Sequence, residues 1–162
     1  MAAESWVFRV VPVPGESFGH YLGRFRRANV LSHKILAAHL GVRAVWVEEW
    51  ERPSRRRNPT DLQLVALGKL MDVEPAQLRR MLPPDRLHLQ TRLCPSCYAE
   101  APVHQAKWQR SSVSLCDRHR LPLLSACPVC NSGFRLPALW ENEQCKQCGL
   151  AFAQMHTALL SN

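Results

Sequence analysis

Cys94-Pro95-Ser96-Cys97 is the first of four short pairs of metal-binding side chains in this sequence of 162 residues. The other three are Cys116-Asp117-Arg118-His119, Cys127-Pro128-Val129-Cys130 and Cys145-Lys146-Gln147-Cys148. In each pair two residues separate the donor side chains, and this spacing forms a tight turn that lets both donors face one ion. Zinc in structural sites takes four sulfur or nitrogen donors at about 2.0–2.3 Å. Eight donors therefore predict two tetrahedral zinc sites that use all seven cysteines.

The order of the pairs suggests how they share the two ions. In the simplest, sequential grouping, the first site takes Cys94, Cys97, Cys116 and His119, and the second takes Cys127, Cys130, Cys145 and Cys148. The spacers of 18 and 14 residues within these groups suit fingers of the zinc-ribbon type. A crossed grouping, in which the first and third pairs share an ion, remains an alternative. Trp108 and Trp140 each lie inside a finger loop and are predicted to be its apolar plug.

The two predicted ions are structural. Each would be closed by four protein donors, so neither keeps the open position that catalytic zinc needs. The sequence contains no glycine-rich phosphate loop, nucleophile elbow or His-Glu-x-x-His motif. Glu48, Glu49 and Glu51 lie beside Arg52 and are predicted to form a solvated face instead of an acid/base pair. The sequence therefore predicts a protein that is not an enzyme.

Composition indicates a cytoplasmic protein with a basic N-terminal half. The chain carries 21 Lys and Arg against 13 Asp and Glu, and 14 of the basic side chains lie in residues 1–90. No apolar stretch reaches the roughly 18–20 residues of a membrane span, and residues 1–11 do not resemble a secretory signal. In a reducing compartment an odd number of cysteines is a poor set for disulfides, which again favours metal.

Four regions are expected along the chain. Residues 1–14 form an extended N-terminal arm, residues 15–83 a helical domain, residues 84–92 a linker, and residues 93–162 a double zinc-finger domain. Five helices are predicted in the second region, beginning after Ser17, after Ser32, at about Arg43, after Asn58 or Thr60, and at Pro75. The predicted fold is mainly α with small zinc-ribbon-like β, in which helix-turn-helix pairs precede two tandem zinc fingers.

Residues 14–29 resemble the opening motif of the TniQ family of transposition target-selection factors; they read Pro14-Gly15-Glu16-Ser17-Phe18-Gly19-His20-Tyr21-Leu22-Gly23-Arg24-Phe25-Arg26-Arg27-Ala28-Asn29. The family's zinc signature follows in the same order, as Cys94-Pro95-Ser96-Cys97, Trp108-Gln109, Cys116-x-x-His119 and Cys127-Pro128-Val129-Cys130. The resemblance spans essentially the whole chain. Many relatives carry a further C-terminal domain, so this sequence is similar to the compact members found with type V-K CRISPR-associated transposons.

This resemblance implies a role in bacterial transposition that composition alone could not reveal. TniQ proteins of this kind are adaptors that link an RNA-guided effector and its guide RNA and tracrRNA to the AAA+ ATPase that recruits the transposase. Target DNA is a further candidate partner. Because the extra domain of the longer, dimeric relatives is missing here, a monomer is expected.

Two surfaces are predicted to make the contacts. Arginine side chains suit phosphate oxygens, so the loop that holds Arg52, Arg55, Arg56 and Arg57 is a candidate RNA site; a solvated run of charge is the alternative. The aromatic side chains of Trp6 and Phe8 are candidate anchors for the ATPase. The alternative for these two is that they pack on the protein's own helices.

A sequence-specific DNA-binding regulator is the competing interpretation. Its recognition helix would be residues 43–52 or 75–82, inserted in the major groove. The first presents Glu48, Glu49 and Glu51, which would repel phosphates, and the second offers Arg79 and Arg80 but few side chains that read base edges. These features favour the adaptor.

Overall fold

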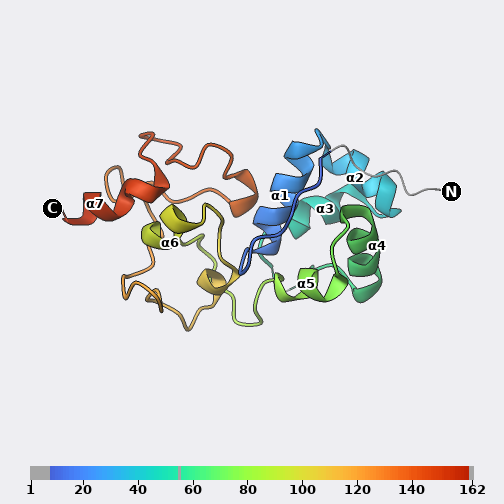
Figure 1. The fold of residues 1–162 in the computed structure, drawn as a ribbon, viewed down its shortest axis with the longest axis horizontal. Coiled ribbons are helices and arrows are strands. Elements are labelled where there is room, and N and C mark those ends of the chain that lie inside the picture. Colours follow the sequence, from blue (N-terminus) through green and yellow to red (C-terminus); the bar gives the residue numbers. More distant parts are fainter. Residues whose placement is uncertain (1–7, 55, 161–162) are drawn as a thin grey trace.

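The computed structural model describes residues 8–54 and 56–160, so Trp6 and Arg55 lie outside the described residues. The described chain is mainly helical (Figure 1), with seven α-helices and three short 3₁₀ helices. The α-helices are α1 (Phe18–Ala28), α2 (His33–Leu40), α3 (Ala44–Trp50), α4 (Asp61–Met71), α5 (Pro75–Arg80), α6 (Pro95–Glu100) and α7 (Met155–Leu160). The 3₁₀ helices are η1 (Ala106–Gln109), η2 (Pro137–Leu139) and η3 (Phe152–Gln154).

The small β component expected from the sequence is not present as strands in the described residues. Antiparallel pairing there is limited to six isolated bridges, among them those between Leu115 and Pro122 and between Ala126 and Gly133. The mainly helical fold is confirmed, and the expected β component is limited to these isolated bridges, three of which flank the knuckles.

The five helices predicted in residues 15–83 are confirmed. Ser32 caps α2 by accepting a hydrogen bond from the Ile35 N–H, and Thr60 caps α4 in a reciprocal pair with Gln63. Gly41 ends α2 in the left-handed conformation, with φ of 64°. The chain therefore follows its local capping signals closely in this half.

Two hydrophobic cores lie side by side along the long axis of the molecule (Figure 1). The first core is built on α1 to α5 and includes Phe18, Tyr21, Leu36, Trp50 and Leu67. Helix α3 contributes the buried Val47 and Trp50 to this core, while its Val45 is exposed. The second core surrounds the cysteine pairs and includes Tyr98, Trp108, Trp140, Phe152 and Met155. Trp108 and Trp140 are buried, as expected of plugs.

Glu51 was predicted to lie on a solvated face, and this is wrong. Its carboxylate is buried and receives two hydrogen bonds from the Arg26 guanidinium, while His33 Nε2 lies 2.9 Å from its Oε2. A buried carboxylate needs such partners because an unpaired charge inside the protein is costly. Glu51 therefore joins α1, α2 and the end of α3.

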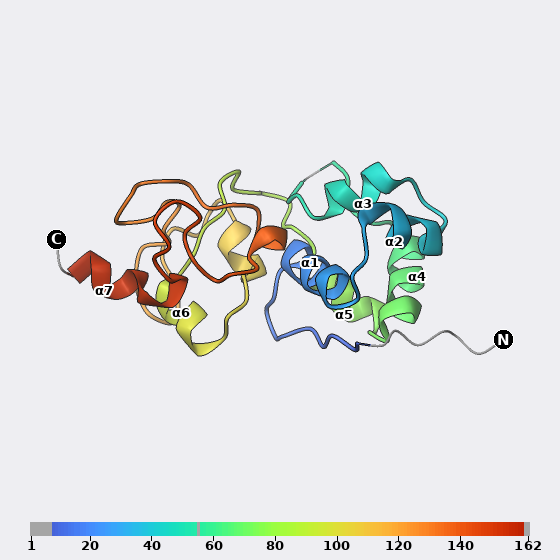
Figure 2. The same cartoon turned by 90° about the horizontal axis from the view of Figure 1, so that it is seen from above.

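Helix α1 packs on both cores. Its Gly23 lies against η2, where an added Cβ would come 2.5 Å from the Ala138 carbonyl oxygen, and Figure 2 shows η2 against α1. Arg27 donates a hydrogen bond to the same carbonyl. Just before α1, the Ser17 N–H donates to the His104 carbonyl at 2.7 Å and the Ala106 N–H donates to the Gly15 carbonyl at 2.9 Å. The opening motif is therefore the joint between the two halves of the molecule.

The segment expected to be a linker is packed against the second half. Leu87 and Arg92 within residues 84–92 are buried, and Leu87 pairs with Arg110 in an antiparallel bridge. Whether the chain divides into domains at this segment stays a prediction. Among the described residues, none of the helices is long and apolar enough to cross a membrane.

Candidate metal centres

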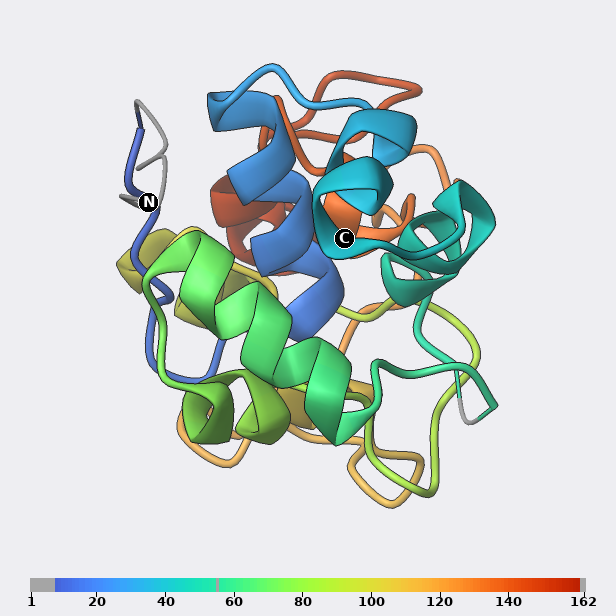
Figure 3. The same ribbon diagram turned by 90° about the vertical axis from the view of Figure 1, so that its right-hand side faces the viewer.

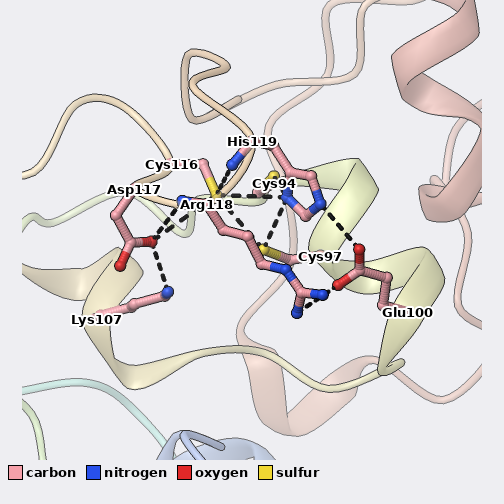
Figure 4. A network of polar contacts seen from close by, with 8 residues as sticks. All are labelled: Cys94, Cys97, Glu100, Lys107, Cys116, Asp117, Arg118 and His119. Carbon is pink, nitrogen blue, oxygen red and sulfur yellow. Dashed lines mark hydrogen bonds and ion pairs between the residues drawn. The ribbon is translucent and has the colours of Figure 1, made fainter.

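The first donor group consists of Cys94, Cys97, Cys116 and His119 (Figure 4). Cys94 and Cys97 lie at the start of α6, where Pro95 occupies the first helical turn. The second group consists of Cys127, Cys130, Cys145 and Cys148. In each group the four donor atoms lie within 4.8 Å of one another. The structure thus brings together the donors that the sequential grouping predicts, and not those of the crossed one.

The spacing of the donor atoms matches a tetrahedral zinc ion. A regular tetrahedron with zinc–sulfur bonds of about 2.3 Å places its sulfurs about 3.8 Å apart, and a nitrogen donor lies slightly closer. The Sγ atoms of Cys97 and Cys116 are 3.4 Å apart, and Cys116 Sγ is 3.6 Å from His119 Nδ1. In the second group the Cys127–Cys148 distance is 3.6 Å. All seven cysteines are free thiols. The donor sets therefore fit zinc, and neither has a place for a substrate.

Three of the four pairs share one backbone design. The residue after the second donor has a positive φ in each: Arg120 at 57°, Asn131 at 56° and Gly149 at 75°. Its N–H donates to the carbonyl of the first donor residue at 2.9 Å in all three loops. This turn points the two donor side chains of a pair to the same side. The Cys94–Cys97 pair differs, because it continues directly into α6.

Glu100 orients the only histidine among the donors. His119 directs Nδ1 at the sulfur atoms, while its Nε2 lies 3.0 Å from Glu100 Oε1 (Figure 4). The other carboxylate oxygen of Glu100 lies 2.7 Å from Arg118 Nη1. A carboxylate behind a histidine ligand holds the ring in one orientation with the proton on the nitrogen away from the metal. The first group thus has a built outer shell, for which Glu100 comes from the last position of α6.

Ser132 plays the corresponding part in the second group. Its Oγ lies 3.3 Å from Cys130 Sγ and 3.4 Å from Cys145 Sγ. Cys148 is exposed, whereas Cys127 and Cys145 are buried. The second centre is therefore closer to solvent than the first and has a hydroxyl where the first has a carboxylate.

The surroundings set one thiol in each group apart. Burial raises the pKa of Cys116, but hydrogen bonds from the His119 N–H and from Cys97 outweigh it and bring the pKa to about 7. Burial also raises the pKa of Cys145, and the hydrogen bond from Ser132 with those from backbone N–H groups lowers it to about 6. Burial raises the pKa of Cys94 and Cys97. A hydrogen bond with Ser132 also lowers the pKa of Cys130. The protons that remain on the thiols leave when a dication binds.

The residues predicted to contact partners lie in the first half. Arg52 and Arg57 are exposed and pair with acidic side chains of α3: Arg52 with Glu48 at 2.9 Å and Arg57 with Glu49 at 2.6 Å. Arg56 is exposed. The Phe8 side chain is 58 % exposed, and the amide of Asn29 bonds both the Phe8 N–H and the Phe8 carbonyl. Both surfaces are thus far from the metal centres in sequence and lie on the helical half.

Sequence reasoning missed the residues that support the site. Glu100 and Ser132 are single polar residues without a motif, and their roles depend on three-dimensional neighbours. Arg92 was assigned to a linker, yet its buried guanidinium donates to the carbonyls of Trp108, Arg110 and Val113 at 2.9, 2.6 and 2.5 Å. His104 belongs to no sequence motif, yet it is fully buried and packs edge-on against Trp140.

Comparison with known families adds the remaining observation. A family model described as TniQ matches residues 7–123, which is most of the chain. The matched span includes the opening motif and the whole first donor group, while the second donor group lies beyond it. A search of curated proteins finds no match.

Proposed function

This chain belongs to the TniQ family, and on that premise we propose that it links an RNA-guided target complex to the AAA+ ATPase of a bacterial transposon. The family implies a transposition-associated adaptor role, and TniQ proteins are not known as enzymes. The finer assignment, to the compact proteins of type V-K CRISPR-associated transposons, rests on the resemblance of residues 14–29 and of the cysteine and histidine pairs.

The observation that best supports an adaptor without catalysis is the closed geometry of both donor groups. In this proposal each group holds one structural zinc ion, and protein side chains occupy all four of its coordination positions. A structural zinc contributes roughly 10–16 kcal/mol of apparent binding energy, which is comparable to the whole free energy of unfolding of a typical domain. The ions supply folding energy, and the second half becomes a rigid body against which α1 is held.

Phe8 is the candidate anchor for the ATPase, together with Trp6. The hydrogen bonds to Asn29 hold the Phe8 backbone at 3.0 and 3.2 Å while its ring stays exposed. An immobilised backbone lowers the entropic cost of inserting an aromatic side chain into a partner's pocket. This arrangement supports docking over the alternative of packing on the protein's own helices.

The test of the anchor compares two exposed apolar side chains. Phe8→Ala should abolish co-purification with the ATPase at an unchanged melting temperature. Leu89→Ala removes a side chain that is 92 % exposed in the segment between the two cores and should leave co-purification intact. A large drop in the melting temperature of Phe8→Ala, with ATPase binding retained, would assign Phe8 to packing instead.

Arg55, Arg56 and Arg57, with Arg52 beside them, are the proposed contact for the guide-associated RNA. Glu48 and Glu49 pair with Arg52 and Arg57 and so neutralise part of this charge. Among the described arginines of the loop, Arg56 is therefore the strongest candidate for a phosphate contact. Replacing Arg55, Arg56 and Arg57 with alanine should lower the salt slope of RNA binding by about 2 units, since each neutralised phosphate contributes about 0.7–0.9. An unchanged slope would remove the loop from the interface.

The DNA-binding regulator is the second candidate function, and the geometry favours it less. Helices α3 and α5 have only seven and six residues. The Arg79 guanidinium is paired with Asp61 at 2.7 Å, so within the described part of the chain Arg80 is the α5 arginine without an ion pair. Tight, sequence-dependent binding to duplex DNA in the absence of RNA and ATPase would favour the regulator and count against the adaptor.

A further inference from the structure

Two hydrogen-bonded loop segments lie beside the candidate RNA loop. Residues 84–92 run next to the loop segments on either side of residue 55 in all three ribbon views (Figures 1, 2 and 3). Residues 109–111 are joined to the same segment by hydrogen bonds, from the His88 N–H to the Gln109 carbonyl at 2.7 Å and from the Ser111 N–H to the Arg86 carbonyl at 2.8 Å. The basic loop is therefore the edge of a larger surface and not an isolated protrusion.

This surface carries arginines that no carboxylate neutralises within the described residues. Arg86 and Arg110 are exposed and lie on the two bridged segments. By contrast, the exposed Arg9, Arg79 and Arg118 pair with Asp72, Asp61 and Glu100 at 2.7–2.8 Å. Other exposed arginines without an ion pair among the described residues, such as Arg135, lie on other segments. Free guanidinium groups keep all their donors for an external anion.

Arg92 adds a third, buried charge beneath the same loops. Its three hydrogen bonds go to carbonyl oxygens, one of them that of Arg110, so its own charge is not cancelled by a carboxylate. Burial lowers the pKa of Arg92, but an arginine stays protonated in proteins. A buried cation that also fixes the backbone of Arg110 gives this surface a rigid frame and a positive potential.

We propose that Arg86 and Arg110 extend the RNA site of the basic loop across both halves, so that Arg56, Arg57, Arg86 and Arg110 form one phosphate-binding face for structured RNA. This basic face rests on the proposed function for the choice of RNA, and it deepens that proposal by adding contacts from the zinc-containing half. In this proposal, loops from both halves of the adaptor contact the phosphate backbone of the same RNA strand.

Loops favour RNA over duplex DNA as the ligand. The major groove of B-form DNA accepts a helix or a two-stranded ribbon, and the basic face is made of irregular loops with a single isolated bridge. Structured RNA is recognised mainly through its shape, phosphates and 2′-hydroxyl groups. Arginines on rigid loops suit such contacts, because phosphate oxygens can be reached from outside the helix without inserting an element into a groove.

The test measures how binding of a fluorescein-labelled RNA hairpin depends on KCl concentration, using the full-length chain loaded with zinc. Arg86→Ala/Arg110→Ala should lower the salt slope by about 1.5, since two phosphate contacts are lost. Lys34→Ala/Arg135→Ala removes the same charge from exposed positions in α2 and before η2, and should leave the slope unchanged. Should alanine disturb the bridge, seen as a lower melting temperature, Arg86→Gln/Arg110→Gln must give the same loss of slope.

Two results would overturn the inference, and they are distinguishable from each other. If Arg56→Ala/Arg57→Ala lowers the slope while Arg86→Ala/Arg110→Ala does not, the RNA site is confined to the loop and the adaptor function stands. If the unaltered protein binds duplex DNA of the same sequence more tightly than the hairpin, the RNA assignment itself fails, and the proposed function with it. Equal slope losses for the two arginine pairs would support the basic face.

Discussion

Ser17 and His104 are hydrogen-bonded to each other twice although 87 residues separate them. The Ser17 hydroxyl lies 2.8 Å from His104 Nδ1, and the Ser17 N–H donates to the His104 carbonyl at 2.7 Å. Ser17 occupies the N-cap position of α1, as the sequence predicts, but its side chain makes no capping bond to that helix. Ser17 therefore stands at a helix N-cap position but joins the two halves of the molecule through its bonds to His104. Changes at this pair should alter the stability of the joint.

The pH dependence of stability should report the burial of His104. Burial, followed by the nearby His20, keeps the pKa of His104 well below its usual range. The pKa of His104 is thus lower in the folded protein than in the unfolded chain, where it is 6.5. Its contribution to the free energy of unfolding is therefore complete above pH 6.5 and is lost as the pH falls. The unfolding free energy should drop by up to about 1.4 kcal/mol per pH unit from this one proton. Chemical denaturation between pH 7.5 and 5.5, with zinc content checked at each point, measures it.

The control for that experiment is His104→Asn, which keeps a side chain able to bond Ser17 but cannot titrate. Its unfolding free energy should change less with pH than that of the unaltered protein over the same range. Parallel curves for the two proteins would show that His104 does not titrate between the folded and unfolded states.

Gly23→Ala should loosen the joint. The new Cβ would come 2.5 Å from the Ala138 carbonyl oxygen and 2.8 Å from its Cα, so α1 and η2 must separate. Overpacking of this kind costs about 1–3 kcal/mol. Gly133→Ala is the matched control, because nothing lies within 4 Å of the added methyl group. Thermal unfolding should show a lower melting temperature for the first variant only; equal temperatures would mean that the joint is more compliant than the structure indicates.

Glu100→Ala should weaken the first metal centre and leave the second unchanged. Removal of the carboxylate frees the His119 ring, and loss of such a partner typically lowers metal affinity about 10–100-fold. Competition with a chromophoric chelator measures zinc release, and cobalt substitution distinguishes a centre with one nitrogen donor from one with four sulfurs. Glu141→Ala, at an exposed position, serves as the control. Unaltered affinity at the first centre would show that Glu100 does not orient the ligand.

Gly149→Ala should destabilise the last knuckle through its backbone alone. Its φ of 75° is unfavourable for a residue with a Cβ, at a cost of about 1–2 kcal/mol, while no atom lies within 4 Å of the methyl group. Arg120 and Asn131 already have a positive φ at the equivalent positions and bear this cost. The substitution Arg120→Gly should therefore raise the free energy of unfolding. Calorimetric melting with saturating zinc tests both; a decrease for Arg120→Gly would disprove the shared backbone design.

Native mass spectrometry should find two zinc ions per chain. The eight donors lie in two separate groups of four, and a tetrahedral structural zinc needs all four donors of its group. Chelation should expose Trp108 and Trp140, seen as a red shift of their fluorescence, because the second core is assembled around the donors. A count of one ion, or an ordered protein after complete removal of zinc, would contradict the structural role of the metal.

Local signals predicted the helical half well. The caps at Ser32 and Thr60, the left-handed Gly41 and the proline at the start of α5 are all encoded within a few residues. The four donor pairs are equally local, and the structure gathers them as the simplest grouping requires. Short-range spacing was therefore enough to locate both the helices and the donor groups.

Long-range partners could not be predicted in the same way. Glu51 looked like one of three solvated acids, yet Arg26 from another helix buries it. Arg92 looked like part of a linker, because nothing near it in sequence shows that three carbonyls from residues 108–113 surround its guanidinium. The missing strands have a related cause: a cysteine pair reveals a turn, but not how far the backbone pairing continues beyond it.

The close approach of Gly23 in α1 to η2 has a practical consequence for anyone who divides this chain. A fragment cut within residues 84–92 would keep α1 but strip Gly23 of the carbonyl that covers it, together with the ties from Ser17 to His104. Such a fragment would expose the backbone of α1 at Gly23 to water. Binding measured on either isolated half would then describe a damaged surface, so partners are best sought with the intact protein.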